Sequence, residues 1–540
     1  MRLLRSRRGS RIDDMSSWRH PVLAVLSSAA LLGSFALPAH GQTPRITPPP
    51  PCRATPADTA LLITARASGE RRGVTSIAVL QFDSRVADPS TAHLAPAITG
   101  RLRSRLAAIT GVSVETAGTV ERAFASSGGR VDSLLSVLSS QYAIVGEVIP
   151  QRDRIDVTVR LVQPGNGAPR WERVFAYPRT SVQQIGETVA GAVAEIAKSR
   201  LPALRTTMSP EAFEIMLRGD YFLAGHDAES ADSARRTYER AAQSDARAAL
   251  PAARAARARG AYLDRAVRSD ARFTGEQVLA GMAMADAALR LDPSLADAWT
   301  AKAILLRYRN PATYAGVVDA HERAVSLAPA SADAHEAYGV TLMRLGRDAA
   351  AEQQLRTALT LEPNRASALL ALAELEFLRR RYGSACALVN ASIGADSYDP
   401  LAYALRARVR MRLSEFRDAS SDAETAGRLS AAPWGEALQL LVTASGTPVD
   451  DARIQGRRLG ATKLGPGVTM SVREGANVSL VFEALGDRRQ ALEALNRVQP
   501  RGVDLAAATR DAGFDAMRTD ARFRRMLQSP TKTALPTSDR

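Results

Sequence analysis

The amino-terminal part of the chain alternates short apolar runs with amphipathic segments. Residues 75–82 and 142–148 are apolar and rich in β-branched residues, which predicts two buried strands. Residues 154–162 alternate apolar with polar side chains, the pattern of a half-exposed strand, and residues 170–177 follow a Pro/Gly turn. We therefore expect 154–162 and 170–177 to pair as a hairpin.

Helical spacing separates these strands. Apolar residues recur every three or four positions in 93–109 and 182–196, which predicts two amphipathic helices. Shorter helical segments are predicted at 120–125 and 131–138, and a short strand is predicted at 112–115. Residues 72–202 are thus expected to form a small α/β domain, a mixed sheet with flanking helices.

Three short motifs in this region resemble the TolB-like amino-terminal domain. The run IAVLQF at 77–82 is similar to the family's first strand, usually written IAVLPF. YAIVGEV at 142–148 and GAPRW at 167–171 are similar to a later strand and to the hairpin return. Gln81 and Glu147 depart from the family pattern without moving the strands. The resemblance implies a non-catalytic binding or assembly module.

Beyond residue 210 the hydrophobic pattern is helical and repeats about every 34 residues. A Leu-x-Pro sequence occurs at 291–293, 327–329 and 361–363, and small or bulky residues return at fixed distances from each proline. Two antiparallel helices cross closely only where the contact residue is small, and a larger residue fills the space between neighbouring pairs. The expected packing residues are Trp299, Ala303, His335, Gly339, Ala351, Leu369, Ala373, Ala385, Tyr403, Ala407 and Ala419.

This pattern resembles tetratricopeptide (TPR) repeats. The implied fold class is multidomain: the α/β domain is followed by an all-α TPR superhelix, an α-solenoid. Clear repeats cover 296–433, and degenerate TPR-like helices cover 210–295 and 434–530. Residues 511–527 resemble the closing segment often found after such arrays, and 531–540 read as a disordered tail. The order of modules resembles the exported half of bacterial TolB-like/TPR proteins.

The TPR resemblance implies a concave groove, lined by the first helix of each pair, that binds a protein or peptide. Met and Phe suit adaptable apolar recognition, and Arg suits carboxylates. Alternatively, the apolar members pack against the next helix. The Lys/Asn clamp of chaperone-binding TPR proteins is missing, because Glu336, Leu370 and Ala404 occupy its Lys-type positions. The predicted partner-binding residues are Ile304, Arg307, Tyr308, Val340, Met343, Arg344, Glu374, Phe377, Arg408 and Met411.

The amino terminus has the pattern of an export signal. Arginines precede an uncharged apolar run at 21–37, and small residues precede Gln42. We expect 1–41 to be a signal peptide or a signal anchor, beginning at Met1 or Met15, and 42–71 to be a Pro/Thr-rich linker. The predicted location is periplasmic or secreted, and the alternative is anchoring in the inner membrane facing the periplasm.

The charge pattern argues against nucleic-acid binding as the function. Lys and Arg total 71 against 56 Asp and Glu, a formal net charge of +15, and nearly all the cations are arginine. Acidic residues are interspersed except in 247–259, which also lacks aromatic residues. A nucleic-acid partner is therefore not expected. The export signal and the TPR resemblance together imply partners that are proteins of the cell envelope.

Candidate chemistry is sparse. His321-Glu322 and His335-Glu336 begin like a zinc-binding helix but lack its second histidine, and no nucleophile or phosphate-loop motif occurs. No catalytic residue, metal or cofactor is predicted. The two cysteines, Cys52 and Cys386, either form a bridge in an oxidising compartment or stay apart. The predicted function is a non-enzymatic exported scaffold; the alternative is a membrane-anchored sensory or regulatory protein with a ligand-responsive TolB-like module.

Overall fold

The computed structural model describes residues 49–53, 75–84, most of 91–196, 208–265, 271–430 without 310, 312, 363 and 364, and then 434–446, 449–465, 468–499 and 502–528. The predicted export signal lies outside these residues, as does most of the linker. Among the described residues, no helix is long and apolar enough to cross a membrane.

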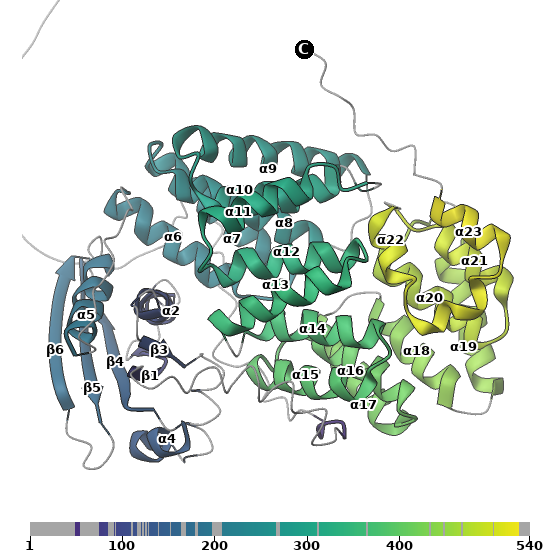
Figure 1. The fold of residues 1–540 in the computed structure, drawn as a ribbon, viewed down its shortest axis with the longest axis horizontal. Helices are drawn as coiled ribbons and strands as arrows, with labels where there is room; N and C mark the ends of the chain where they lie inside the picture. Colours follow the sequence, from purple (N-terminus) through teal and green to yellow (C-terminus); the bar gives the residue numbers. More distant parts are fainter. Residues whose placement is uncertain are drawn as a thin grey trace, which may run out of the picture. The chain divides into compact units, whose positions relative to one another are not determined.

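The described strands of the amino-terminal part form one mixed sheet (Figure 1). β1 pairs in parallel with β3 and β4, whereas β4, β5 and β6 form antiparallel pairs, so the sheet order is β3-β1-β4-β5-β6. The two-residue β2 also pairs with β4. The predicted hairpin is confirmed, with Val157 opposite Phe175. The bounds are β1 Thr75–Val79, β2 Asp83–Ser84, β3 Val112–Val114, β4 Tyr142–Pro150, β5 Arg154–Val162 and β6 Pro169–Pro178.

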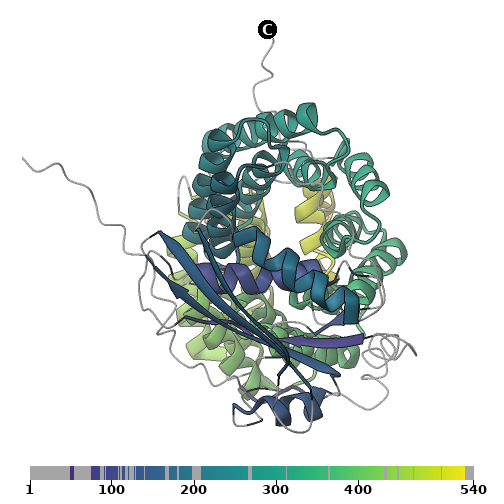
Figure 2. The same cartoon turned by 90° about the vertical axis from the view of Figure 1, so that its left-hand side faces the viewer.

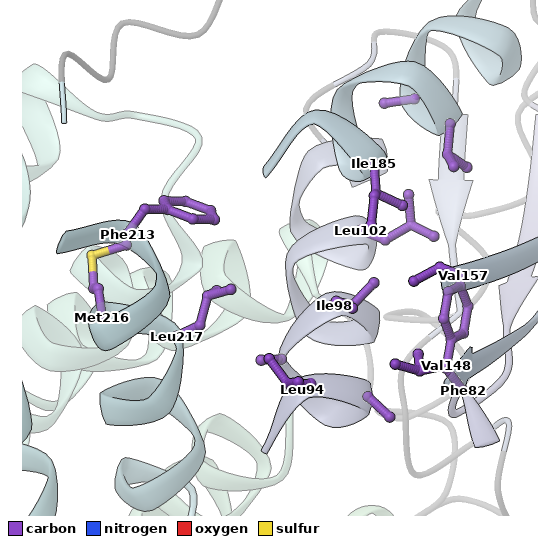
Figure 3. Close-up of a cluster of buried hydrophobic side chains, with 14 of the residues drawn as sticks. Phe82, Leu94, Ile98, Leu102, Val148, Val157, Ile185, Phe213, Met216 and Leu217 are labelled. Atoms are coloured by element: carbon purple, nitrogen blue, oxygen red, sulfur yellow. The ribbon is translucent and has the colours of Figure 1, made fainter. Parts of the chain in front are cut away.

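Helices α2 (Leu94–Ala107) and α5 (Val182–Ile196) pack their apolar sides against the sheet. A further helix, α4, spans Val131–Leu138. Figure 3 shows Ile98 and Leu102 of α2 facing Val148 and Val157. The same buried cluster continues into α6 through Phe213, over whose ring the Arg101 guanidinium lies 5.1 Å from the centroid. The apolar spacing read from the sequence therefore marks the core-facing side of α2.

From residue 210 onward the described chain is a succession of antiparallel helix pairs (Figure 1). This confirms the predicted order of a small mixed sheet followed by a TPR-like solenoid. The pairs are α6 Pro210–Leu223 with α7 Ala228–Ser244, α8 Ala249–Arg265 with α9 Ala271–Leu291, α10 Ala296–Arg309 with α11 Val317–Leu327, α12 Ala332–Arg344 with α13 Asp348–Leu361, α14 Ala366–Leu378 with α15 Tyr382–Ala395, α16 Pro400–Arg412 with α17 Phe416–Ser430, α18 Trp434–Gly446 with α19 Val449–Lys463, and α20 Val472–Ala484 with α21 Arg488–Asn496. The chain then forms α22 Val503–Ala508, the 3₁₀ helix η3 Ala512–Met517 and α23 Ala521–Gln528.

The turn inside each central pair uses a left-handed backbone residue. Gly346, Arg380 and Ser414 have φ of 73°, 64° and 61° and follow one another at 34-residue intervals. Only glycine adopts this conformation without steric cost. Two of the three turns are therefore strained, because they carry Arg and Ser.

The small residues predicted at helix contacts are all buried. Ala303, Ala373 and Ala407 have no exposed surface, and neither do Ala351, Ala385 and Ala419 of the second helices. The larger residues show a regularity that the sequence did not reveal. The ring N–H or O–H groups of Trp299, His335 and Tyr403 lie 3.0–3.1 Å from the carbonyl oxygen six residues earlier in the chain. Each of these side chains thereby ties its first helix to the turn that precedes it.

Candidate peptide-binding groove

The ten predicted groove residues lie on α10, α12, α14 and α16, the first helices of four consecutive pairs. Eight of them form two rows one helical turn apart, and Tyr308 and Arg344 lie beside the row nearest the helix ends. Arg307, Met343 and Phe377, in the row nearest the helix ends, are 6%, 5% and 2% exposed. Ile304, Val340 and Glu374, in the preceding row, are half-buried. Tyr308, Arg344, Arg408 and Met411 are also half-buried.

The chain's own carboxyl-terminal segment lies across the last turns of these helices. We call residues 502–518 the closing segment. In Figure 2 the teal and green helices follow a curve, and the yellow closing segment lies on its inner side, where α22 contacts α12. The Val503 amide donates to the Pro311 carbonyl at 2.9 Å, and Arg510 donates to the Met343 carbonyl at 2.9 Å. The closing segment therefore lies beside the end of α12, next to Met343 of the predicted groove.

Asp504 anchors the first part of the closing segment. Its carboxylate accepts hydrogen bonds from Arg344 on α12 and from the Tyr314 hydroxyl. Burial raises the pKa of Asp504, but the charges of Arg344 and Arg307 outweigh it, and the net pKa lies below the usual value. Asp504 therefore stays ionised and forms a charged bridge between the groove and the closing segment.

Asp511 anchors the second part. It is 2% exposed and accepts hydrogen bonds from Arg408 and Arg412 of α16. Burial raises the pKa of Asp511, but the two guanidinium groups lower it by more than burial raises it, so the net pKa is about 2. Beside Asp511 lies a cavity of about 180 Å³ lined by Arg408, Met411, Arg412, Leu441, Ser445, Leu480, Glu483, Ala484, Asp511 and Gly513. Two predicted groove residues, Arg408 and Met411, thus meet at one cavity.

In the preceding row, Arg408 pairs with Asp511 of the closing segment, whereas other members keep a face toward solvent. Val340 and Glu374 keep part of their surface exposed. Arg473, on α20, interacts electrostatically with Glu374 and stacks on Trp434, with 5.7 Å between guanidinium and ring. An apolar position, a carboxylate and a guanidinium therefore share this part of the concave face.

The amino-terminal end of the groove is closed by a different set of contacts. Asp264 of α8 accepts hydrogen bonds from Arg307 and from the Tyr308 hydroxyl. Burial, followed by the Asp264 charge, raises the pKa of Tyr308 well above its usual value. Arg307 and Tyr308 are thus already engaged by an acidic residue of the chain itself.

Sequence reasoning missed the groups that engage the groove. Asp264, Asp504 and Asp511 are separated from their arginine partners by 43, 160 and 103 residues in the sequence. A signal does exist, because residues 511–527 resemble a segment that often follows such arrays, but nothing in the sequence places it on the concave face. Within the described part of the chain, no three His, Cys, Asp or Glu residues gather as a metal site.

No protein-family model matches the chain, and no curated protein matches it. Solved structures similar to it include pilF of Pseudomonas aeruginosa, 20% identical, with a TM-score of 0.32 over 40% of this chain and 94% of that one. A TPR protein of Parabacteroides merdae is 11% identical, with a TM-score of 0.34 over 47% and 92% of the two chains. Yeast Tom70 is 13% identical, with a TM-score of 0.35 over 76% and 84%. The repeat assignment rests on this chain's own helix pairs and their 34-residue spacing.

Proposed function

We propose that the protein is a non-enzymatic scaffold whose TPR-like superhelix binds an extended or helical segment of a cell-envelope protein. One observation carries the proposal: the concave face already holds a chain segment through Arg–Asp pairs and carbonyl contacts. The row with exposed surface, which includes Val340 and Glu374, is the part that a partner contacts. Apolar contact there contributes about 25 cal/mol per Å² buried, and the charges of Glu374 and Arg473 select the partner's orientation.

The export part of the proposal is supported by the signal-like amino terminus and by the disulfide between Cys52 and Cys386. Disulfides persist in oxidising compartments, and the periplasm is one of them. The mixed sheet, whose strands follow the order of the three TolB-like motifs, supports a TolB-like module next to the repeats. Cell fractionation tests the location: recovery of the full chain in the cytoplasm contradicts export.

The groove is tested by photo-cross-linking in the full-length protein. A photoreactive amino acid at Val340 samples the concave face, and one at Ala350, exposed on the second helix α13, is the matched control. We expect a discrete adduct from position 340 and none from position 350. Equal labelling at both positions, or none at either, contradicts the groove proposal.

The cross-linked partner then provides an affinity test. Glu374→Arg reverses a charge at the proposed contact, and Ala350→Arg adds the same charge on the other helix. We expect Glu374→Arg to weaken binding at least tenfold and Ala350→Arg to change it less than twofold. Phe377→Glu is unsuitable here, because Phe377 is 2% exposed and the charge would disrupt the fold.

A further inference from the structure

The described piece of the Pro-rich linker, residues 49–53, lies against the helices of two neighbouring pairs. We call this piece the arm. A disulfide joins Cys52 to Cys386 of α15, with 5.9 Å between their Cα atoms and 334 residues between them in the sequence. The pairing that the sequence left open is therefore formed. It fixes the start of the described chain to the middle of the solenoid.

Asn390, one helical turn after Cys386, recognises the arm's backbone. Its side-chain oxygen accepts a hydrogen bond from the Cys52 amide at 3.3 Å, and its side-chain nitrogen donates to the Cys52 carbonyl at 3.0 Å. An amide side chain that satisfies both backbone groups of one residue recognises an extended peptide whatever the side chain at that position. This contact does not require the disulfide.

Two arginines of α16 recognise the preceding prolines. Arg406 donates to the Pro49 carbonyl at 3.2 Å, and Arg410 donates to the Pro50 carbonyl. Proline has no amide hydrogen, so a proline-rich segment forms no backbone ladder of its own and offers its carbonyl oxygens to other donors. The spacing of Arg406 and Arg410 matches successive carbonyls of such a segment.

The charge balance inside the solenoid gives these carbonyls a structural role. Arg406 and Arg410 are 2% and 0% exposed, and both donate to Asp422 of α17, which is also fully buried. Two guanidinium groups therefore share one buried carboxylate, and Glu415 lies 3.7 Å from Arg410. Buried charge is costly unless hydrogen-bonded, and the arm's carbonyls supply part of that compensation.

We propose that Asn390, Arg406 and Arg410 form a binding site for an extended proline-rich segment, that this chain's own residues 49–53 occupy it, and that the Cys52–Cys386 disulfide locks the occupant in place. The site is separate from the proposed concave groove and stands without it. Reduction by a dithiol breaks the S–S bond: the dithiol gives up two electrons and two protons and becomes a disulfide, and Cys52 and Cys386 become thiols. The polar contacts then hold the arm reversibly.

A redox titration of the full-length protein measures how strongly the site binds the arm. The protein is equilibrated with reduced and oxidised glutathione, and free thiols are quantified by alkylation and mass spectrometry. The contacts raise the effective concentration of the two thiols relative to each other. We therefore expect Asn390→Ala to lower this effective concentration about tenfold, the loss expected for one to two net hydrogen bonds. Arg417→Ala, at an exposed position on α17, is the control and should change it less than twofold. An unchanged equilibrium for Asn390→Ala overturns the proposal.

A second measurement avoids the disulfide altogether. In Cys52→Ser the site is intact, and the docked arm should shield the Cys386 thiol from iodoacetamide. Adding Asn390→Ala should speed alkylation of Cys386 several-fold while the circular dichroism spectrum stays unchanged. Equally rapid alkylation with and without Asn390→Ala contradicts docking. A disulfide-linked dimer of the oxidised wild-type protein overturns the intramolecular occupant, because a second copy's arm then fills the site.

Discussion

The close crossing of α12 and α13 can be tested at Gly339. A Cβ atom added at Gly339 would lie 2.8 Å from Leu355 Cγ and 3.2 Å from the Ala351 carbonyl oxygen. Leu355 is fully buried, and the Ala351 oxygen belongs to the backbone of α13, so neither can move without shifting the helix pair. Gly427, on α17, is the matched control, because an added Cβ there meets no atom within 4 Å.

Two opposing effects set the size of the change. Replacing glycine by alanine inside a helix stabilises it by about 1 kcal/mol, and both variants gain this. Overpacking a filled site costs about 1–3 kcal/mol, and only Gly339→Ala incurs it. We therefore expect Gly339→Ala to lower the free energy of unfolding by about 1 kcal/mol and Gly427→Ala to raise it by about 1 kcal/mol.

Hydrogen exchange of the α12 and α13 amides, followed by mass spectrometry, measures the local effect in the full-length chain. Urea unfolding monitored by circular dichroism at 222 nm provides the global comparison. The opposite signs of the two variants are the decisive result. If Gly339→Ala stabilises the protein as much as Gly427→Ala does, the helices do not cross closely at this residue and the packing argument fails.

Three further predictions concern strain, pH and the closing segment. Ser414→Gly should stabilise the protein by about 1 kcal/mol in urea unfolding, because it relieves a left-handed residue with φ of 61°. Burial, aided by Arg307, lowers the pKa of His321 to about 3, so the folded state excludes a proton that the unfolded state takes up below about pH 6.5. The free energy of unfolding should therefore decrease as the pH is lowered, by about 2 kcal/mol at pH 5. Melting measured against pH should show a smaller decrease in His321→Gln. Asp511→Asn should cost about 3 kcal/mol and increase proteolysis near residue 511, because it leaves Arg408 and Arg412 without their buried carboxylate; an unaltered digest would contradict that role.

Local patterns in the sequence were enough to predict the helix pairs. The recurrence of Ala303, Gly339, Ala373 and Ala407 reports contacts between helices that are neighbours in the chain, so a 34-residue window contains both partners. The pairing of β5 with β6 was predictable for a similar reason, since the two strands lie within one hairpin.

The burial of the predicted groove residues and their contacts with the closing segment were not predictable in this way. In the sequence Phe377 fits both a ligand contact and a packing residue, and the structure buries it beneath Arg408, whose guanidinium lies 4.7 Å from the ring centroid. The closing segment reaches the groove from more than 100 residues away, and no periodic pattern encodes such a contact. The preference of Arg for carboxylates was a sound principle, but the carboxylates of Asp504 and Asp511 come from the chain itself.

The same distinction explains the acid-free segment at residues 247–259. Residues 247–259 contain no acidic residue, and in the sequence they resemble an electrostatic patch. In the fold three of their four arginines pair with acidic residues of other helices, so most of the charge of this segment is compensated by residues distant in the sequence. The acid-free segment at 247–259 therefore does not by itself point to a nucleic-acid partner. The pairs are Arg254 with Asp297, Arg257 with Asp333, and Arg259 with Glu239.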